Sequence, residues 1–242
     1  MIFIKIYAII IKNKHKKERN ILNLFNFNKT VPFVRKKGIK GYFQIIFHSF
    51  FDLVLLNFIF VLTSLPIVTI GASYKALVEV LNKYAEDENV YPIREYFSNF
   101  KKEFLKSSGY GILFLFTFFI IAFSCNFYLN LAKENIIFLL FACVSLICLI
   151  LLAMIFGWFF PLFTKIDQKL SALIINSFIL SFRFIKSTLC FLAVVLICFL
   201  LIFAFFPYSL PVIFILPFVL IALASSCGAA EKINEVFDIK KD

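Results

Sequence analysis

Long apolar runs constrain the fold of this chain more than any other feature. Two of them lie at about residues 109–129 and 136–160, and the short link Asn130–Asn135 between them holds one cation, Lys133. About 20 apolar residues in a helix cross the hydrocarbon of a bilayer, and so short a link predicts an antiparallel pair. Hydrophobic residues make up 62% of the 242 residues, whereas soluble domains hold roughly 45–50%. The sequence therefore predicts an all-α integral membrane protein.

The apolar runs divide the chain into a basic N-terminal tail, residues 1–41, and a single membrane domain, residues 42–238. Five membrane spans are expected in this domain, at about residues 42–65, 109–129, 136–160, 187–206 and 208–227. Pro211 and Pro217 are expected to kink the last one. Between the spans, apolar side chains recur at helical spacing, which predicts cytoplasmic amphipathic helices at Ser73–Glu86, Ile93–Lys106 and within Pro161–Lys186.

The distribution of the 25 Lys and Arg residues predicts the orientation, because cations collect on the cytoplasmic side of a membrane. Five full crossings would divide these cations 12 to 13, which does not satisfy the rule. Either residues 42–72 enter and leave on the same side, with 24 cations inside and one outside, or the basic tail is translocated. Both arrangements place the segments 71–108 and 161–186 and the C-terminus in the cytoplasm. The protein itself is expected to lie in the cell membrane. The side of the tail stays open.

Polar residues near the start of the membrane domain, with two in a later hydrophilic segment, are the candidate functional positions. A carboxylate in hydrocarbon is costly, so Asp52 is either an ion or proton site or a structural hydrogen bond near the interface. Pro66 removes a backbone donor and interrupts the helix, Gly71 is expected to adopt a backbone angle that other residues resist, and Ser73 is expected to cap the next helix. The full set of candidates is Asp52, Asn57, Pro66, Thr69, Gly71, Ser73, Asp167 and Asn176.

Catalytic and metal-binding motifs are not found in the sequence. It has no H-E-x-x-H pattern, no nucleophile elbow and no Gly-Lys-Ser/Thr phosphate loop. The six cysteines lie in apolar runs and are expected to pack as small side chains. We therefore expect no enzyme of a familiar type, no metal and no cofactor. The net charge of +11 is interpreted as helix flanks that face anionic lipid headgroups, not as a nucleic-acid surface.

Three stretches of the sequence resemble the YesL family of bacterial membrane proteins. They are DLVLLNFIFVLTSLPIVTIGASYKAL from residue 52, FSNFKKEF from residue 97 and WFFPLFTKIDQKLSALIINSFILS from residue 158. The resemblance covers about residues 42–238 and is carried above all by the Leu-Pro-Ile-Val-Thr-Ile-Gly-Ala-Ser run. It implies a bacterial membrane protein of unknown function, whose genes often neighbour those of carbohydrate ABC transporters.

Two functions are compatible with these features. The first is an accessory or scaffold protein linked to carbohydrate uptake, with a sugar ABC transporter as its expected partner. The second is a small transporter or channel that uses Asp52 and the segment Pro66–Gly71, since broken helices and intramembrane acids serve transport sites. Polar residues that converge around a cavity would favour transport, whereas scattered and locally bonded ones would favour a scaffold.

Overall fold

The computed structural model describes residues 39–86, 90–205 and 216–237, and within these ranges the protein is helical without a strand. The predicted all-α class is therefore confirmed. Most of the predicted tail and Pro211 lie outside the described residues. The elements are α2 (Ile39–His48), α3 (Phe50–Ser64), the 3-10 turn η1 (Ile67–Thr69), α4 (Ile70–Ala85), α5 (Pro92–Lys101), α6 (Phe104–Leu131), α7 (Ile137–Lys165), α8 (Leu170–Arg183), α9 (Ile185–Ala204) and α11 (Pro217–Val236).

Three helices are long and apolar enough to cross a membrane, namely α6, α7 and α9. They lie where the second, third and fourth spans were predicted. The pair α2–α3 would add a fourth if it is treated as one broken span. Within the described residues there are thus three candidate spans, or up to four, and the predicted five are not confirmed.

The first and last predicted spans differ from continuous helices. The first is interrupted at Ser49, where the axes of α2 and α3 differ in direction by 85°. It ends before Pro66, as predicted. In the last, residues 208–215 lie outside the described residues, and Pro217 begins α11 instead of kinking it. The first helical position suits proline, because its backbone nitrogen needs no hydrogen bond there.

Helix α4 lies at the centre of the folded body. It packs against α3, α5, α6, α7 and α11, and 13 of its 16 residues are buried. The predicted amphipathic helix at Ser73–Glu86 is therefore a core helix held against the bundle. Three of its polar side chains, Ser73, Lys75 and Asn82, are buried among neighbouring helices, whereas Lys83 is partly exposed.

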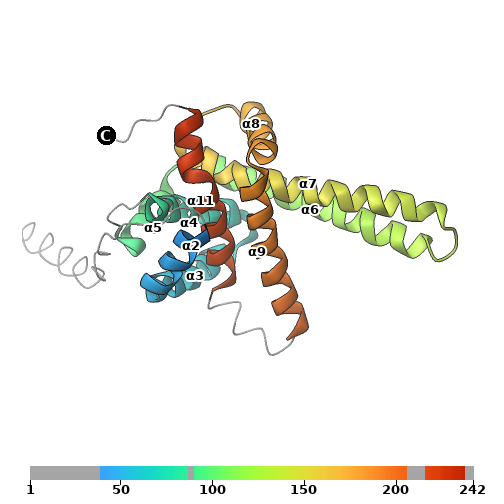
Figure 1. Ribbon diagram of the computed structural model, residues 1–242, viewed down its shortest axis with the longest axis horizontal. Helices are drawn as coiled ribbons and strands as arrows, with labels where there is room; N and C mark the ends of the chain where they lie inside the picture. Colours follow the sequence, from blue (N-terminus) through green and yellow to red (C-terminus); the bar gives the residue numbers. More distant parts are fainter. Residues whose placement is uncertain (1–38, 87–89, 206–215, 238–242) are drawn as a thin grey trace, which may run out of the picture.

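The α6–α7 hairpin projects from one side of this body, and α9 and α11 run across its direction (Figure 1). At its base, aromatic rings join the hairpin to α4. Phe114 of α6 packs edge-on against Phe159 of α7 at 4.8 Å between centroids, and Tyr74 of α4 meets Phe156 and Phe160 at 4.9 Å. Beyond this base the apolar side chains of both arms are largely exposed.

Helix α7 continues through Pro161 to Lys165, five residues past the predicted end of the span at residue 160. Proline has no N–H, so the carbonyl of Gly157, four residues earlier, loses its helical donor. The hydroxyl of Ser225 in α11 donates to this carbonyl at 2.5 Å. Trp158 is also buried in this region, and its Nε1 donates to Thr188 of α9 at 2.9 Å. It is a packing residue and not part of an interfacial aromatic belt.

Candidate functional site

The chain reverses at Pro66 through a turn that is closed by one side chain. The hydroxyl of Thr69 lies 2.6 Å from the carbonyl oxygen of Thr63 and 2.7 Å from that of Pro66, so one donor is shared between two acceptors. Pro66 itself has an extended backbone and ends α3. The predicted helix breaker Pro66 and the candidate Thr69, for which no role was predicted, both shape the same turn between α3 and α4.

Gly71 is important for its size and not for its backbone angle. It lies inside α4 with no left-handed φ, so the predicted reason for a glycine is wrong. A Cβ added at Gly71 would lie 2.8 Å from the Cα of Gly111 and closer still to the carbonyl oxygen of Ser107. A Cβ at Gly111 would meet the nitrogen of Gly71 at 2.6 Å. The two glycines therefore allow the backbones of α4 and α6 to touch.

Ser73 does not cap α4, because the helix begins three residues earlier, at Ile70. The first helical turn forms sooner than predicted, since the Pro66–Thr69 turn already directs the backbone into it. Ser73 is fully buried, as is Tyr96 of α5. Burial raises the pKa of Tyr96 to about 12, and its hydroxyl lies 2.6 Å from that of Thr63. These side chains fix α5 against the α3–α4 pair.

Asp52 accepts a hydrogen bond from the hydroxyl of Tyr84 at 3.2 Å. Asp52 lies in the first turn of α3 and Tyr84 in the last turn of α4, so the bond joins the open ends of this helical pair. Burial, and then the neighbouring Asp52 carboxylate, raise the pKa of Tyr84, which keeps its hydroxyl protonated as a donor. Of the two interpretations of Asp52, this geometry favours the structural hydrogen bond.

Asn57 is fully buried in α3 and serves another helix. Its Oδ1 accepts the backbone N–H of Val219 at 3.1 Å, in the first turn of α11. The first N–H groups of a helix have no partner within it. Asn57 therefore supplies to α11 the acceptor that a capping residue usually provides.

The two candidates in the later segment form separate polar contacts. Asp167 lies between α7 and α8, and Lys106 Nζ donates to its Oδ1 at 2.6 Å. This hydrogen bond and the charge of Lys106 lower the pKa of Asp167. Asn176 of α8 donates to Gln168 at 2.8 Å. Neither contact involves Asp52, Asn57 or the Pro66 turn.

The structure therefore groups Pro66, Thr69, Gly71 and Ser73 around one turn but does not gather the eight candidates at one site. Within the described ranges, no three His, Cys, Asp or Glu side chains are arranged to hold a metal ion. The arrangement provides local structural bonds. It brings no set of carboxylates, hydroxyls or amides together where a substrate or ion would be held.

A buried ionic cluster was not anticipated from the sequence. Lys165, the last residue of α7, donates to Glu86 after α4, to the carbonyl of Ala230 at 3.0 Å and to Asn234 of α11 at 2.7 Å. Asn234 also donates to Glu86 at 2.6 Å. We call these four residues the Lys165 clamp. The sequence analysis did not single out Lys165, since its partners are 65 or more residues away.

A second ionic cluster surrounds Lys75, whose side chain is only 2% exposed. Its Nζ lies 2.8 Å from Glu79 and 3.8 Å from Glu103, and Lys106 lies 3.6 Å from the same Glu103. Glu103 has φ of 56°, in the left-handed region that non-glycine residues seldom occupy. This conformation lets the turn before α6 present one carboxylate to both lysines.

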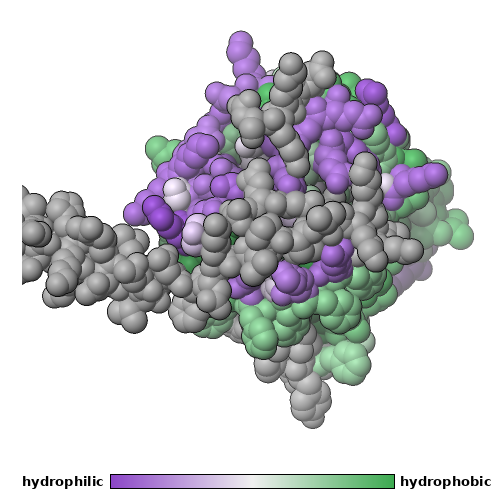
Figure 2. Space-filling view, turned by 60° about the vertical axis from the view of Figure 1, so that its left-hand side comes forward, coloured by the Kyte–Doolittle hydropathy of each residue, from purple (hydrophilic) through white to green (hydrophobic). Residues whose placement is uncertain are grey.

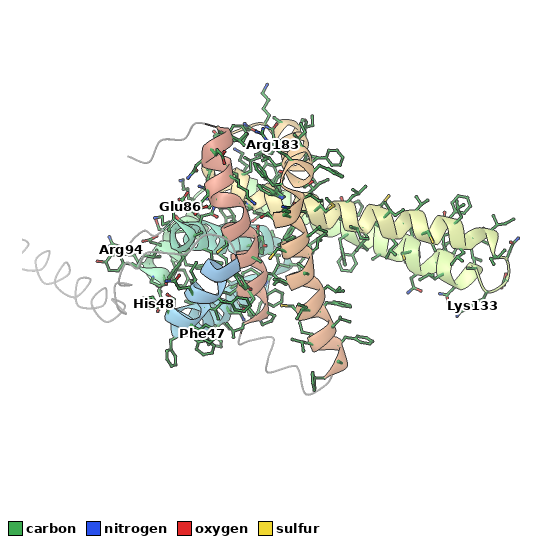
Figure 3. The ribbon with its side chains drawn as sticks, in the orientation of Figure 1. Phe47, His48, Glu86, Arg94, Lys133 and Arg183 are labelled. Carbon is green, nitrogen blue, oxygen red and sulfur yellow. The ribbon has the colours of Figure 1, made fainter. Side chains whose placement is uncertain are left out.

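Both clusters lie beneath a charged surface at the end of the body away from the hairpin. Figure 2 shows hydrophilic side chains gathered over this end, and Figure 3 places Arg94 and Glu86 there, whereas Lys133 marks the far tip of the hairpin. We call this surface the polar end face. Its exposed charged residues are Arg94, Lys101, Lys102, Glu103, Asp167, Lys169, Glu231 and Glu235.

Comparison with known proteins identifies one family. Residues 53–125 match the family model described as "Protein of unknown function, DUF624". This is the family commonly called YesL. The match runs from α3 into α6 and so includes the Pro66 turn and the contact between Gly71 and Gly111. It covers less than half of the chain, and the resemblance at residues 158–181 lies outside it. No curated protein and no solved structure matched the chain.

Proposed function

We propose that the protein is an accessory membrane protein that holds a partner at its polar end face. The observation that supports this proposal is the dispersion of the candidate polar residues. Asp52, Asn57 and Asp167 each bond to a different neighbour, in three separate places. A transport or catalytic site needs such groups to converge, whereas a scaffold uses them to fix its helices.

In the proposed orientation, the α6–α7 hairpin crosses the cell membrane and the polar end face lies in the cytoplasm, with segments 71–108 and 161–186 and the C-terminus. The separation of the polar end face from Lys133 supports this orientation (Figure 3). Single cysteines at Ser98 and Gln168, in a protein without native cysteines, should react with an impermeant maleimide only in inverted vesicles. A cysteine at Lys133 should react in intact cells. Labelling of position 98 or 168 in intact cells would refute the orientation.

The partner that we propose is a sugar ABC transporter. This choice depends on the resemblance to YesL proteins. The polar end face supports it only in that the face exposes both positive and negative charges. Arg94, Lys101 and Lys169 are exposed, and so are Glu231 and Glu235. A surface of mixed charge fits a protein partner with complementary charges, since such complementarity fixes register and rejects wrong partners.

Affinity purification after crosslinking in intact cells tests this function. The wild type and the control Lys133→Glu should recover the subunits of a sugar ABC transporter. The double variant Arg94→Glu/Lys101→Glu should recover at least 10-fold less of these subunits, since both exposed charges are reversed. Recovery of no transporter subunit with the wild type, or equal recovery with all three proteins, would contradict the proposal.

A small transporter or channel is the second candidate, and the break of the helix at Pro66, with a half-buried Asp52 at the opposite end of α3, is the observation that favours it. It requires a flux of sugar or ions through the purified protein in liposomes, and this flux should disappear in Asp52→Asn. A flux no higher than in empty liposomes would exclude it.

A further inference from the structure

We infer that α3 and α4 form a re-entrant hairpin whose apolar turn inserts into the acyl chains of the cytoplasmic leaflet and returns without crossing the bilayer. The inference is independent of what binds at the polar end face. It concerns the side of the membrane on which the N-terminal tail lies, which the distribution of cations leaves open.

The direction of the chain in α3 and α4 supports a re-entrant hairpin. Asp52 at the start of α3 bonds to Tyr84 at the end of α4, so the segment enters and leaves at the same level. At the other end, Thr69 closes the turn. With 15 and 16 residues, the two helices are about 22–24 Å long at 1.5 Å per residue. This length is shorter than the roughly 30 Å of hydrocarbon that a crossing helix must span.

The depth at which the turn lies also fits a re-entrant hairpin. Gly71, just after the turn, touches Gly111 of α6. Gly111 follows the charged Lys106 by only five residues, or about 8 Å along the helix. From Gly111 to the polar Asn130 near the hairpin tip, α6 continues for about 28 Å more. If Lys106 marks the cytoplasmic boundary, the turn therefore lies in the first half of the bilayer.

The chemistry of the turn is suited to contact with lipid. Leu65, Ile67 and Val68 are 71%, 70% and 57% exposed, at the end of the pair that carries no charge. This apolar surface continues along α3 through Phe58 and Leu62. Because η1 packs against α6, this surface lies close to the exposed side chains of Ile112 and Leu113, just beyond Gly111, which the crossing hairpin would present to lipid. Continuity with that surface identifies acyl chains as the occupant.

The distribution of charge favours the same arrangement. A re-entrant hairpin keeps the basic tail on the same side as the polar end face, so 24 of the 25 cations lie in the cytoplasm and only Lys133 lies outside. Translocation of the tail would carry its 11 cations across the membrane. The first distribution agrees with the preference of cations for the cytoplasmic side.

The side of the membrane on which two single cysteines lie tests whether the α3–α4 segment crosses the bilayer. In a cysteine-free protein, single cysteines are placed at Asn28, before the hairpin, and at Arg94, after it, with Lys133→Cys as the control that is accessible from outside. An impermeant maleimide should label positions 28 and 94 in inverted vesicles only. Labelling of positions 28 and 94 from opposite sides would mean that the segment crosses and would overturn the inference.

Depth of the turn tests whether it inserts. Ile67→Cys carries an environment-sensitive fluorophore, and the protein is reconstituted with lipids that bear a nitroxide quencher on the acyl chain. The fluorescence should fall at least 2-fold, whereas the same fluorophore at Arg94→Cys should remain within 10% of its unquenched value. Equal fluorescence of the two positions would show that the turn is not in lipid and would also overturn the inference. Because both positions are exposed or partly exposed, neither substitution is expected to prevent folding.

Discussion

Gly71 and Gly111 have no room for a side chain where α4 and α6 touch, whereas Gly109, two residues away, has open space around it. We predict that Gly71→Ala destabilises the protein by about 1–3 kcal/mol or more, the usual effect of overpacking. Gly109→Ala should instead be neutral or stabilise α6 by about 0.5–1 kcal/mol, since alanine favours a helix. Thermal unfolding of the detergent-solubilised variants measures both. Equal unfolding temperatures would show that the helices do not touch there.

Ser225 and Pro161 are coupled through one carbonyl oxygen, that of Gly157. We predict that Ser225→Ala costs about 1–3 kcal/mol, because the carbonyl is left buried without a donor. In the background of Pro161→Ala, position 161 regains an N–H for the same carbonyl, so Ser225→Ala should cost less than half as much. A double-mutant cycle of unfolding free energies measures the coupling. Additive effects would contradict this role of Ser225.

At the scale of elements, the Lys165 clamp joins α7, α11 and the end of α4. Removing one partner of a buried ion pair is predicted to cost about 3–5 kcal/mol. Lys165→Met should therefore lower the unfolding temperature strongly. Lys165→Met/Glu86→Gln should recover part of the loss, since no unpaired carboxylate then remains. Lys133→Met, at the exposed tip of the hairpin, is the matched control and should unfold like the wild type. A double variant as unstable as Lys165→Met would refute the charge-based explanation.

Sequence patterns predicted best the helices that have the same kind of surroundings along their whole length. The apolar runs of α6 and α7 specify long helices because almost every residue meets lipid or a partner arm, and the short link fixes their antiparallel order. The amphipathic pattern of α4 could not distinguish a membrane surface from a protein core, since both bury one face. Its burial depends on packing with α7 and α11, which come much later in the chain.

The roles of the candidate residues also divide into those that a local pattern predicts and those that it does not. Pro66 was predicted correctly because a proline breaks a helix through its own missing donor. The role of Gly71 was wrong because the reason for a glycine there lies in Gly111, on another helix. Asn57 and Lys165 are similar cases, with partners in α11 that no local pattern specifies. Roles that depend on contacts between distant segments are absent from any single stretch of sequence.

At the scale of the whole molecule, a flat bilayer has a single normal, so helices that cross it run in similar directions. Helix α9, however, runs across the direction of the α6–α7 hairpin (Figure 1). Besides the bond from Trp158 to Thr188, contacts with α7 and α11 hold the first part of α9 in place. Phe191 packs against Gly157 of α7, and Ser187 donates to the carbonyl of Gly228 in α11. Helix α11 is in turn fixed to α3 by Asn57. With the hairpin as the crossing element, α9 therefore lies oblique to the bilayer normal.

We predict that Leu189 and Phe199, both exposed on α9, lie at similar depths in the membrane. The residues are ten positions apart, or about 15 Å along the helix. If α9 were parallel to the hairpin, their depths would differ by nearly that distance. Fluorophores on single cysteines at the two positions, measured with lipids quenched at a shallow and at a deep acyl carbon, should give the same ratio of quenching. A steep gradient between them, with Phe199 near the outer surface, would mean that α9 crosses beside the hairpin and that the body rearranges around Gly157 in the bilayer.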